Sequence, residues 1–391
     1  MLPPSSDVLI VGAGPTGMAL AISLLQSGID HVIVDKLPQG QNTSRAAVIH
    51  AHTLEMLEPL GVNAELTGRG IRLADFAIRD RGRALLKLKF DKLPSRYPYL
   101  LMLPQDITEA VLAERYMALG GTIHRGVEVS GLRQDGDGAV AELQSAAGAH
   151  RICGRYVVGA DGMHSIVRDA AGIRFDGKTY EESFVLADVR MDWPLGSSEV
   201  SLFFSPAGLV VVAPLPENAF RIVATFEQAP EHVGIPALES LLAERGPGGA
   251  SAIREVIWSS RFHIHHRVVP TYRNGRLLLM GDAAHVHSPA GGQGMNTGLV
   301  DAMLLAKVLS GVIGGARPES DLDAYGDARR HAATEVLGLA GRLTGMATMR
   351  NAGKRMIRNA ALSGVNLMPP AKRKLVMNLS GLARSGYSVL Q

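Results

Sequence analysis

A chain of 391 residues, 46% hydrophobic and 20% charged with a net charge of +3, can build two or three hydrophobic cores and has the composition of a globular protein. A single cysteine, Cys153, excludes a disulfide framework, a Cys-x-x-Cys redox pair and a thiolate metal cluster. Apolar runs stay below membrane-spanning length and the first residues do not resemble a signal peptide, so we expect a cytoplasmic protein.

The first forty residues have the pattern of a βαβ unit. An apolar run at 7–11 predicts a buried strand, a glycine turn follows at 12–17, an apolar helix is expected at 18–26, and a second strand at 31–34 ends on Asp35. In a G-x-G-x-x-G turn the glycines let the backbone approach a pyrophosphate at the helix N-terminus, and the later acid can bind a ribose hydroxyl. The sequence therefore predicts a dinucleotide site here.

The middle of the chain contains two kinds of segment. A helix is expected at 107–118 and a buried strand at 155–159, as in the first unit. Strands of alternating apolar and polar residues dominate 74–99 and 175–269. We therefore expect an antiparallel sheet inserted between pieces of the nucleotide-binding domain.

A glycine-rich loop near residue 290 is predicted to form a second part of the ligand site. The apolar run at 276–280 predicts a buried strand, Gly281 and Asp282 follow it, and a helical pattern begins at about Met295. The stretch 290–294 has no bulky or ionisable side chain. Backbone N–H groups of such a loop can approach a ligand at the positive end of the following helix.

The C-terminal segment is basic and is expected to be mainly helical. Residues 336–391 contain nine Lys and Arg and no Asp or Glu. This pattern fits a solvated helical face, or a peripheral contact with an anionic membrane or an acidic partner. Nucleic acid is not expected, because the basic residues are not interleaved with aromatic ones and the remaining chain is net acidic.

Three motifs together, the glycine turn at 12–17, Asp-Gly at 161–162 and Gly-Asp at 281–282, resemble the single-component flavoprotein aromatic hydroxylases, the para-hydroxybenzoate hydroxylase family. The resemblance covers nearly the whole chain. It implies an α/β fold with an α+β insert: a Rossmann-like FAD-binding domain, an inserted antiparallel sheet for the substrate, and C-terminal helices. The implied boundaries are 1–73, 100–174 and 270–325 for the FAD-binding domain, 74–99 and 175–269 for the sheet domain, and 326–391 for the helical region.

The resemblance also implies which residues hold FAD. Asp35 is expected to bind the adenosine ribose, Asp282 the ribityl chain, and the backbone N–H groups of Met295 and Asn296 the flavin ring. The full expected set is Gly12, Gly14, Pro15, Thr16, Gly17, Asp35, Lys36, Arg45, Gln105, Val129, Asp161, Gly162, Asp282, Pro289, Gly292, Gly294, Met295 and Asn296.

The implied activity is an FAD-dependent monooxygenase. It would use NADPH or NADH and O2 to hydroxylate an electron-rich aromatic compound, phenolic or polyketide- or quinone-like, through a flavin C4a-hydroperoxide. NAD(P)H is expected to visit transiently, because a second dinucleotide fingerprint is absent. No catalytic side chain is assigned, since the flavin does the chemistry, with Pro289 and Gly292 near its ring. His285 and His287 have no acid at ligand spacing, so we expect no metal.

The substrate pocket and two other functions stay open at this point. Candidates for contact with the substrate are Tyr97, Tyr99, Phe203, Arg221 and His263, and the chain could be a monomer or a homodimer. A reductase or halogenase on the same scaffold is one alternative, although the halogenase Trp-x-Trp-x-Ile-Pro motif is absent. A non-catalytic FAD-binding protein is the other.

Overall fold

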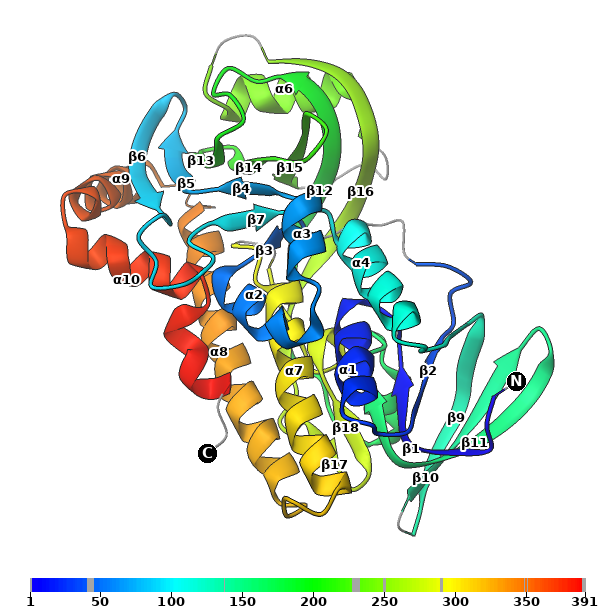
Figure 1. Cartoon of the computed structure of the whole chain (residues 1–391). Coiled ribbons are helices and arrows are strands. Elements are labelled where there is room, and N and C mark those ends of the chain that lie inside the picture. Colours follow the sequence, from blue (N-terminus) through cyan, green and yellow to red (C-terminus); the bar gives the residue numbers. More distant parts are fainter. Residues whose placement is uncertain are drawn as a thin grey trace.

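A computed structural model describes residues 2–40, 46–136, 138–226, 233–248, 251–288, 291–347, 349 and 351–388, without the side chains of 179–182, 262–264 and 388. The chain builds two large sheets, a small sheet between them, and a set of long helices along one side (Figure 1).

The first sheet is mostly parallel and follows from the apolar runs of its strands. β1 pairs in parallel with β2 on one side and β11 on the other, and its residues Val8 to Val11 are buried. The strand order is β17-β18-β11-β1-β2-β8, and β9 and β10 extend it as an antiparallel hairpin on β11. Its strands are β1 (Ser5–Val11), β2 (His31–Asp35), β8 (Ile123–Arg125), β9 (Val127–Asp135), β10 (Gly138–Ser145), β11 (Gly148–Gly159), β17 (Arg273–Asn274) and β18 (Leu277–Leu279).

The second sheet is antiparallel except where β13 pairs with β5. Its order is β19-β16-β12-β15-β14-β13-β5-β6. The long strands β12 and β16 pair along most of their length and connect the two sheets (Figure 1). Its strands are β5 (Asp75–Asp80), β6 (Arg83–Lys89), β12 (Asp176–Asp192), β13 (Glu199–Ser205), β14 (Gly208–Pro214), β15 (Ala219–Phe226), β16 (Ala252–Val268) and β19 (His285–Val286).

The two faces of the second sheet bury different residues, because successive side chains of a strand point to opposite faces. On β14, Val210 and Val212 pack against the core under α6, whereas Leu209, Val211 and Ala213 face the opposite side. The small sheet of β3 (Val48–Ile49), β7 (Leu100–Met102) and β4 (Ile71–Leu73) lies between the two large sheets (Figure 1).

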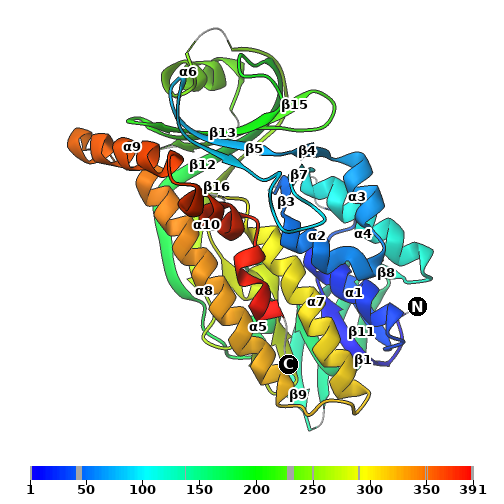
Figure 2. The same cartoon turned by 60° about the vertical axis from the view of Figure 1, so that its left-hand side comes forward.

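Helices cover the first sheet and continue to the edge of the second. α1 lies against α7 and α4, and α8 runs beside α7 (Figure 2). The helices are α1 (Pro15–Gln26), α2 (Ala51–Leu57), α3 (Asn63–Arg69), α4 (Gln105–Ala118), α5 (Ile166–Ala170), α6 (Ile235–Arg245), α7 (Gly294–Ile313), α8 (Asp321–Ala347), α9 (Ala352–Asn366) and α10 (Pro369–Leu379), with short 3-10 turns η1 (Glu58–Leu60), η2 (Gly281–Ala283) and η3 (Leu382–Ser388).

Two expected boundaries differ from the structure. β19, which we placed in the FAD-binding domain, pairs with β16 and so belongs to the second sheet. The boundary at residue 326 falls inside α8, which is continuous from Asp321 to Ala347. Both differences arise because long helices and paired strands carry the chain across regions that composition alone separates.

Helix α7 is the core helix of this fold. Within the described ranges it alone is long and apolar enough to cross a bilayer, but 78% of the apolar window is buried inside the protein. Its buried face packs on α1 and α8, which is the environment of a core helix.

Candidate FAD and substrate site

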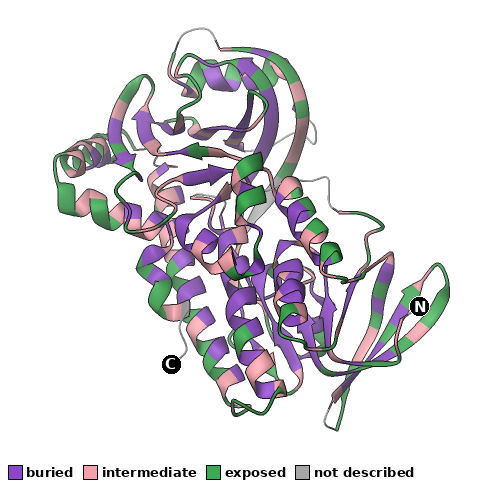
Figure 3. Cartoon of the chain, viewed as in Figure 1, coloured by how far each residue is buried: buried purple, intermediate pink, exposed green. Residues whose placement is uncertain are grey.

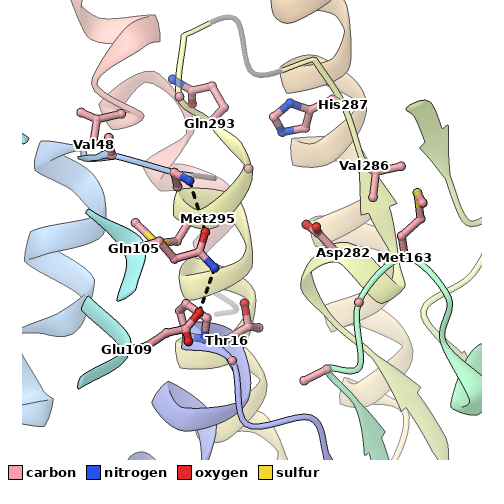
Figure 4. A pocket seen from close by; sticks show the side chains of 18 of the residues that line it. Thr16, Val48, Gln105, Glu109, Met163, Asp282, Val286, His287, Gln293 and Met295 are labelled. Atoms are coloured by element: carbon pink, nitrogen blue, oxygen red, sulfur yellow. Dashed lines mark hydrogen bonds between the residues drawn. The ribbon is translucent and has the colours of Figure 1, made fainter. Parts of the chain in front are cut away.

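One cavity of about 780 Å³ connects the glycine turn after β1 with the inner face of the second sheet. Thr16, Gln105 and Met295 lie on one side of it, and Met163, Asp282 and Val286 on the other (Figure 4). These residues come from all three sequence motifs and from the second sheet. The fold therefore brings segments far apart in the chain into one site.

The glycine turn is shaped by close backbone contacts. A Cβ on Gly17 would lie 1.9 Å from the Gly12 carbonyl oxygen, and one on Gly12, where φ is +105°, would lie 2.3 Å from the Ala160 carbonyl oxygen. At Gly14 a Cβ would meet nothing within 4 Å. Gly14 lines the cavity and caps α1, whose N-terminus has no side-chain cap. The turn thus leaves N–H groups and open space for a phosphate at the positive end of α1.

Thr16 brings the first and third motifs together. A Cβ on Gly281 would lie 3.0 Å from Thr16 Oγ1, and a Cβ on Gly298 would lie 2.5 Å from the same atom. Only glycine at these two positions lets α1 approach both η2 and α7 so closely. The N-termini of α1 and α7 consequently open into the same cavity, to which Gly14 and Met295 both contribute.

A buried cluster of charged side chains holds the turn at Gly281. Asp301 of α7 accepts hydrogen bonds from the Gly281 N–H at 3.0 Å, from His285 Nε2 at 2.7 Å and from Arg329 Nε at 2.5 Å. Burial alone would raise the pKa of Asp301, but the charges and hydrogen bonds of Arg329 and His285 together outweigh it and hold the pKa below its ordinary value. The cluster ties η2, β19 and α8 to α7, so Asp282 projects from a rigid turn.

Two other carboxylates hold backbone at the ends of the central strands. Asp35 accepts hydrogen bonds from Ala13 N at 2.7 Å and from Leu37 N at 2.8 Å. Asp161 Oδ2 accepts one from Ile166 N at 2.8 Å, whereas its Oδ1 is buried without a hydrogen-bond partner among the described residues. Burial raises the pKa of Asp161. Both residues line the cavity.

The start of α7 is held by amide side chains. Asn296 donates to the carbonyls of Val48 at 2.9 Å and Gly292 at 2.8 Å, and it accepts from His50 N at 2.8 Å. Gln293 donates to the Leu379 carbonyl at 2.9 Å. These bonds position the first turn of α7 without a side-chain cap on its N–H groups, which are left for an electron-rich ligand atom.

The end of the loop that follows β2 is held from two domains. Gln105 Oε1 accepts from Ala46 N at 3.2 Å, and Arg221 Nη1 donates to the Ala46 carbonyl at 2.7 Å. Arg221 also makes a bidentate pair with Asp188, with both distances 2.7 Å. Arg221 and Gln105 line the cavity, so this clamp lies where the two domains meet over the site.

The part of the cavity next to the second sheet, which we call the chamber, has apolar walls. The residues that line it come from the second sheet, the small sheet and the C-terminal helices: Phe76, Phe90, Leu100, Met102, Val200, Leu202, Leu209, Val211, Ala213, Val223, Leu343 and Leu379. His287 lies where the chamber meets the third motif (Figure 4). Burial lowers the pKa of His287 to about 4, so its imidazole is neutral near pH 7. The chamber therefore suits a ring-shaped, weakly polar molecule.

Most of the expected cofactor residues line this cavity. They are Gly12, Gly14, Pro15, Thr16, Asp35, Lys36, Gln105, Val129, Asp161, Gly162, Asp282, Gly292, Gly294 and Met295. Gly17 instead packs on Gly12, and the Asn296 side chain braces the loop beside the cavity. Arg45 and Pro289 lie outside the described residues.

Three of the candidates for contact with the substrate do not line the cavity. Tyr97 is bound through its hydroxyl to Glu58 at 2.9 Å, Tyr99 stacks under Arg72, and Phe203 belongs to the core beneath α6. Arg221 does line the cavity, and the side chain of His263 lies outside the description. Strand alternation in 200–204 and 209–213 contained the signal for the chamber wall, but the sequence did not show which face was inward.

The donor set fits a flavin dinucleotide. Two uncapped helix N-termini face one cavity, an open glycine turn adjoins one of them, and an apolar chamber adjoins the other. Comparison with known proteins agrees. A family model described as FAD binding domain matches residues 5–340.

The chain belongs to the FAD-dependent aromatic hydroxylases.

Known members of this family are similar over most of the chain. The 6-methylpretetramide 4-monooxygenase of Streptomyces rimosus is 35% identical over 98% of this chain and 71% of its own length. The pentachlorophenol 4-monooxygenase of Sphingobium chlorophenolicum is 33% identical over 84% of this chain and 63% of its own. The crystal structure of p-nitrophenol 4-monooxygenase from Pseudomonas putida DLL-E4 superposes with a TM-score of 0.90 at 26% identity, covering 97% of this chain and 99% of that one.

Family membership makes this hydroxylase an FAD enzyme with NAD(P)H as co-substrate. When bound, FAD supplies the redox chemistry: it takes electrons from NAD(P)H and activates O2 toward an aromatic ring. The protein's part is to bind FAD and the substrate, to orient them, and to exclude water. The α1 turn is suited to the pyrophosphate, and the α7 N-terminus to negative charge on the reduced ring. The apolar chamber keeps water away from the reacting atoms.

Proposed function

We propose that this hydroxylase acts on a bulky, uncharged phenolic compound that binds in the apolar chamber, and that the expected residues along the first half of the cavity hold FAD. The observation that carries the proposal is the alternation of β13 and β14, which turns Val200, Leu202, Leu209 and Val211 toward the same cavity as the glycine turn. Such a wall favours burial of a ring system, at about 25 cal/mol per Å² of apolar surface removed from water.

The charged groups around the chamber also indicate which charge the substrate carries. Arg221 is committed to Asp188 and Ala46, and His287 is kept neutral by burial. Arg261 lies exposed at the rim. Among the described residues, the only buried arginine of the cavity is already paired with Asp188, so a carboxylate inside the chamber would lose its hydration without a compensating partner from them, which costs several kcal/mol by order of magnitude. This argument favours a neutral phenol over an aromatic acid.

The names of the relatives support a phenolic substrate. They are named for pentachlorophenol, p-nitrophenol and tetracycline precursors, which range from one ring to several. The identity of the compound for this chain is set by the dimensions of its own chamber.

A panel of matched compounds tests the proposal. Purified FAD enzyme is given NADPH or NADH with phenols of one to four rings, each beside its carboxylated analogue, and products are weighed by mass spectrometry. We expect neutral phenols to stimulate NAD(P)H oxidation and to gain one oxygen atom, and the carboxylated analogues to do neither. Preference for the carboxylates, with FAD still bound, would contradict the proposed substrate class and leave the cofactor assignment intact.

A further inference from the structure

Helix α9 exposes apolar residues along one side. Met356, Ile357, Leu367 and Met368 are 71%, 69%, 82% and 56% exposed. With the exposed small residues between them they form what we call the α9 stripe: Met356, Ile357, Ala360, Ala361, Gly364, Leu367 and Met368. Positions three, four and seven apart share one side of a helix, so the residues from Met356 to Gly364 lie on one side of α9, and Leu367 and Met368 follow directly after its last residue. Figure 3 shows α9 and α10 projecting at the edge of the molecule with much of their surface exposed.

The opposite side of α9 is firmly attached to the fold. Arg358 is buried, stacks over Phe204 at 4.7 Å and donates to the Met346 carbonyl at 2.7 Å. Asn359 donates to Asp80 at 2.8 Å, and Asn366 accepts from the Lys87 N–H at 3.2 Å. These contacts fix the rotation of α9. The stripe therefore faces outward because a buried arginine holds the inner side.

The surroundings of the α9 stripe are basic. Lys354 of α9 is exposed, and so are Arg373 and Lys374 of α10, the helix that follows α9 and contacts it. The sequence from 336 to 391 contains no acidic residue. A second copy packed on the same face would bring these cations together with no carboxylate from this segment between them, because a twofold interface repeats one patch on both subunits. An apolar centre with a cationic margin instead complements a negatively charged lipid surface.

We propose that the α9 stripe and the first turns of α10 dock the enzyme on an anionic phospholipid bilayer. The stripe inserts at the level of the acyl chains, and Lys354, Arg373 and Lys374 lie among the anionic headgroups. Leu379, at the other end of α10, lines the chamber, so the docked element also contributes to the chamber wall. The proposal does not depend on which aromatic compound is hydroxylated.

Vesicle co-sedimentation of the FAD-bound enzyme tests this docking. One set of vesicles is pure phosphatidylcholine and the other contains phosphatidylglycerol, each at low and high salt. The wild type is expected to bind the phosphatidylglycerol vesicles and to be released as salt rises. Ile357→Ser/Leu367→Ser should weaken binding at least about tenfold. Lys354→Gln/Arg373→Gln/Lys374→Gln should weaken it about fivefold per residue and remove the preference for anionic lipid.

Matched variants separate the patch from general surface effects. Met117→Ser/Ile257→Ser removes apolar residues that are 55% and 46% exposed elsewhere, and Arg133→Gln/Arg151→Gln/Arg155→Gln removes three exposed charges of the β9–β11 region. Both should bind like the wild type, and retained flavin absorbance checks that every variant is folded. Absence of wild-type binding, or equal losses in the control variants, overturns the proposal. So does a dimer in sedimentation velocity that the Ile357→Ser/Leu367→Ser variant dissociates without losing lipid binding.

Discussion

Arg221 of β15 reaches out of its own sheet and donates a hydrogen bond to the Ala46 carbonyl at 2.7 Å, at the end of the loop that follows β2. Asp188 of β12 holds the rest of the guanidinium through two bonds of 2.7 Å. The contact joins the second sheet to the segment that follows β2, at the cavity. Its strength depends on the planar fork of arginine, which a lysine cannot reproduce.

Removal of Arg221 should destabilise the fold, because Asp188 would lose its ion-pair partner. Arg221→Ala is expected to lower the free energy of unfolding by about 3–5 kcal/mol, since a buried carboxylate loses its partner. The double variant Arg221→Ala/Asp188→Ala should regain a large part of that loss. Denaturant unfolding of the two single variants and the double variant measures the coupling. Losses that simply add would show that the pair does not act as a unit.

Two glycines of the first turn should respond differently to an added side chain. Gly14→Val places its side chain in the open cavity, so the apoprotein should keep its melting temperature while FAD binds at least about tenfold more weakly. Gly17→Ala puts a Cβ against the Gly12 carbonyl and should destabilise the fold itself. Calorimetry and FAD titration distinguish the two. If the Gly14→Val enzyme bound FAD with wild-type affinity, the pyrophosphate would not lie at the glycine turn.

Acidification should destabilise the site through buried histidines. Burial lowers the pKa of His50, His52 and His287 to about 4, below the ordinary value of 6.5. Between these values the unfolded chain binds more protons than the folded one, so stability is fully present above about pH 6.5 and is lost as the pH falls toward 4. Each group contributes up to roughly 3 kcal/mol. His50→Gln should flatten the dependence of the unfolding free energy on pH in this window, and an unchanged slope would contradict the assignment.

Neighbouring valines of β14 test which face forms the chamber. Val211 lines the cavity and Val210 is buried under α6. Val211→Phe should raise KM for multi-ring phenols far more than for one-ring phenols, with FAD binding unchanged. Val210→Phe should overpack the other core and cost about 1–3 kcal/mol of stability without changing the order of preference among substrates. If the effects of the two variants were interchanged, the opposite face of the sheet would line the chamber.

The parts of the site that the sequence predicts are those encoded locally. The turn from Gly12 to Gly17 is specified by its own glycines and the strand and helix beside it, and Asp35 follows at a set spacing. The Gly281 turn is recognisable for the same reason. The other expected cofactor residues were named from the resemblance to the hydroxylase family.

The contacts that assemble the site are not local, and the sequence did not reveal them. Asp188 and Arg221 meet because β12 and β15 pair in one register, and a shift by one residue would separate them. Gln293 receives a hydrogen bond from Arg384 across 91 positions. Tyr97 and Phe203 were candidates for contact with the substrate, yet Tyr97 donates to Glu58 and Phe203 packs in the core beneath α6.

Isotope labelling during turnover tests the central claim most directly. The FAD-bound enzyme is supplied with NADPH, a neutral phenol that stimulates NADPH oxidation, and ¹⁸O2 in unlabelled water. An aromatic hydroxylase that keeps water out of the apolar chamber should insert one labelled oxygen atom into the ring for each coupled turnover. Unlabelled product, with its new oxygen drawn from water, would contradict the account.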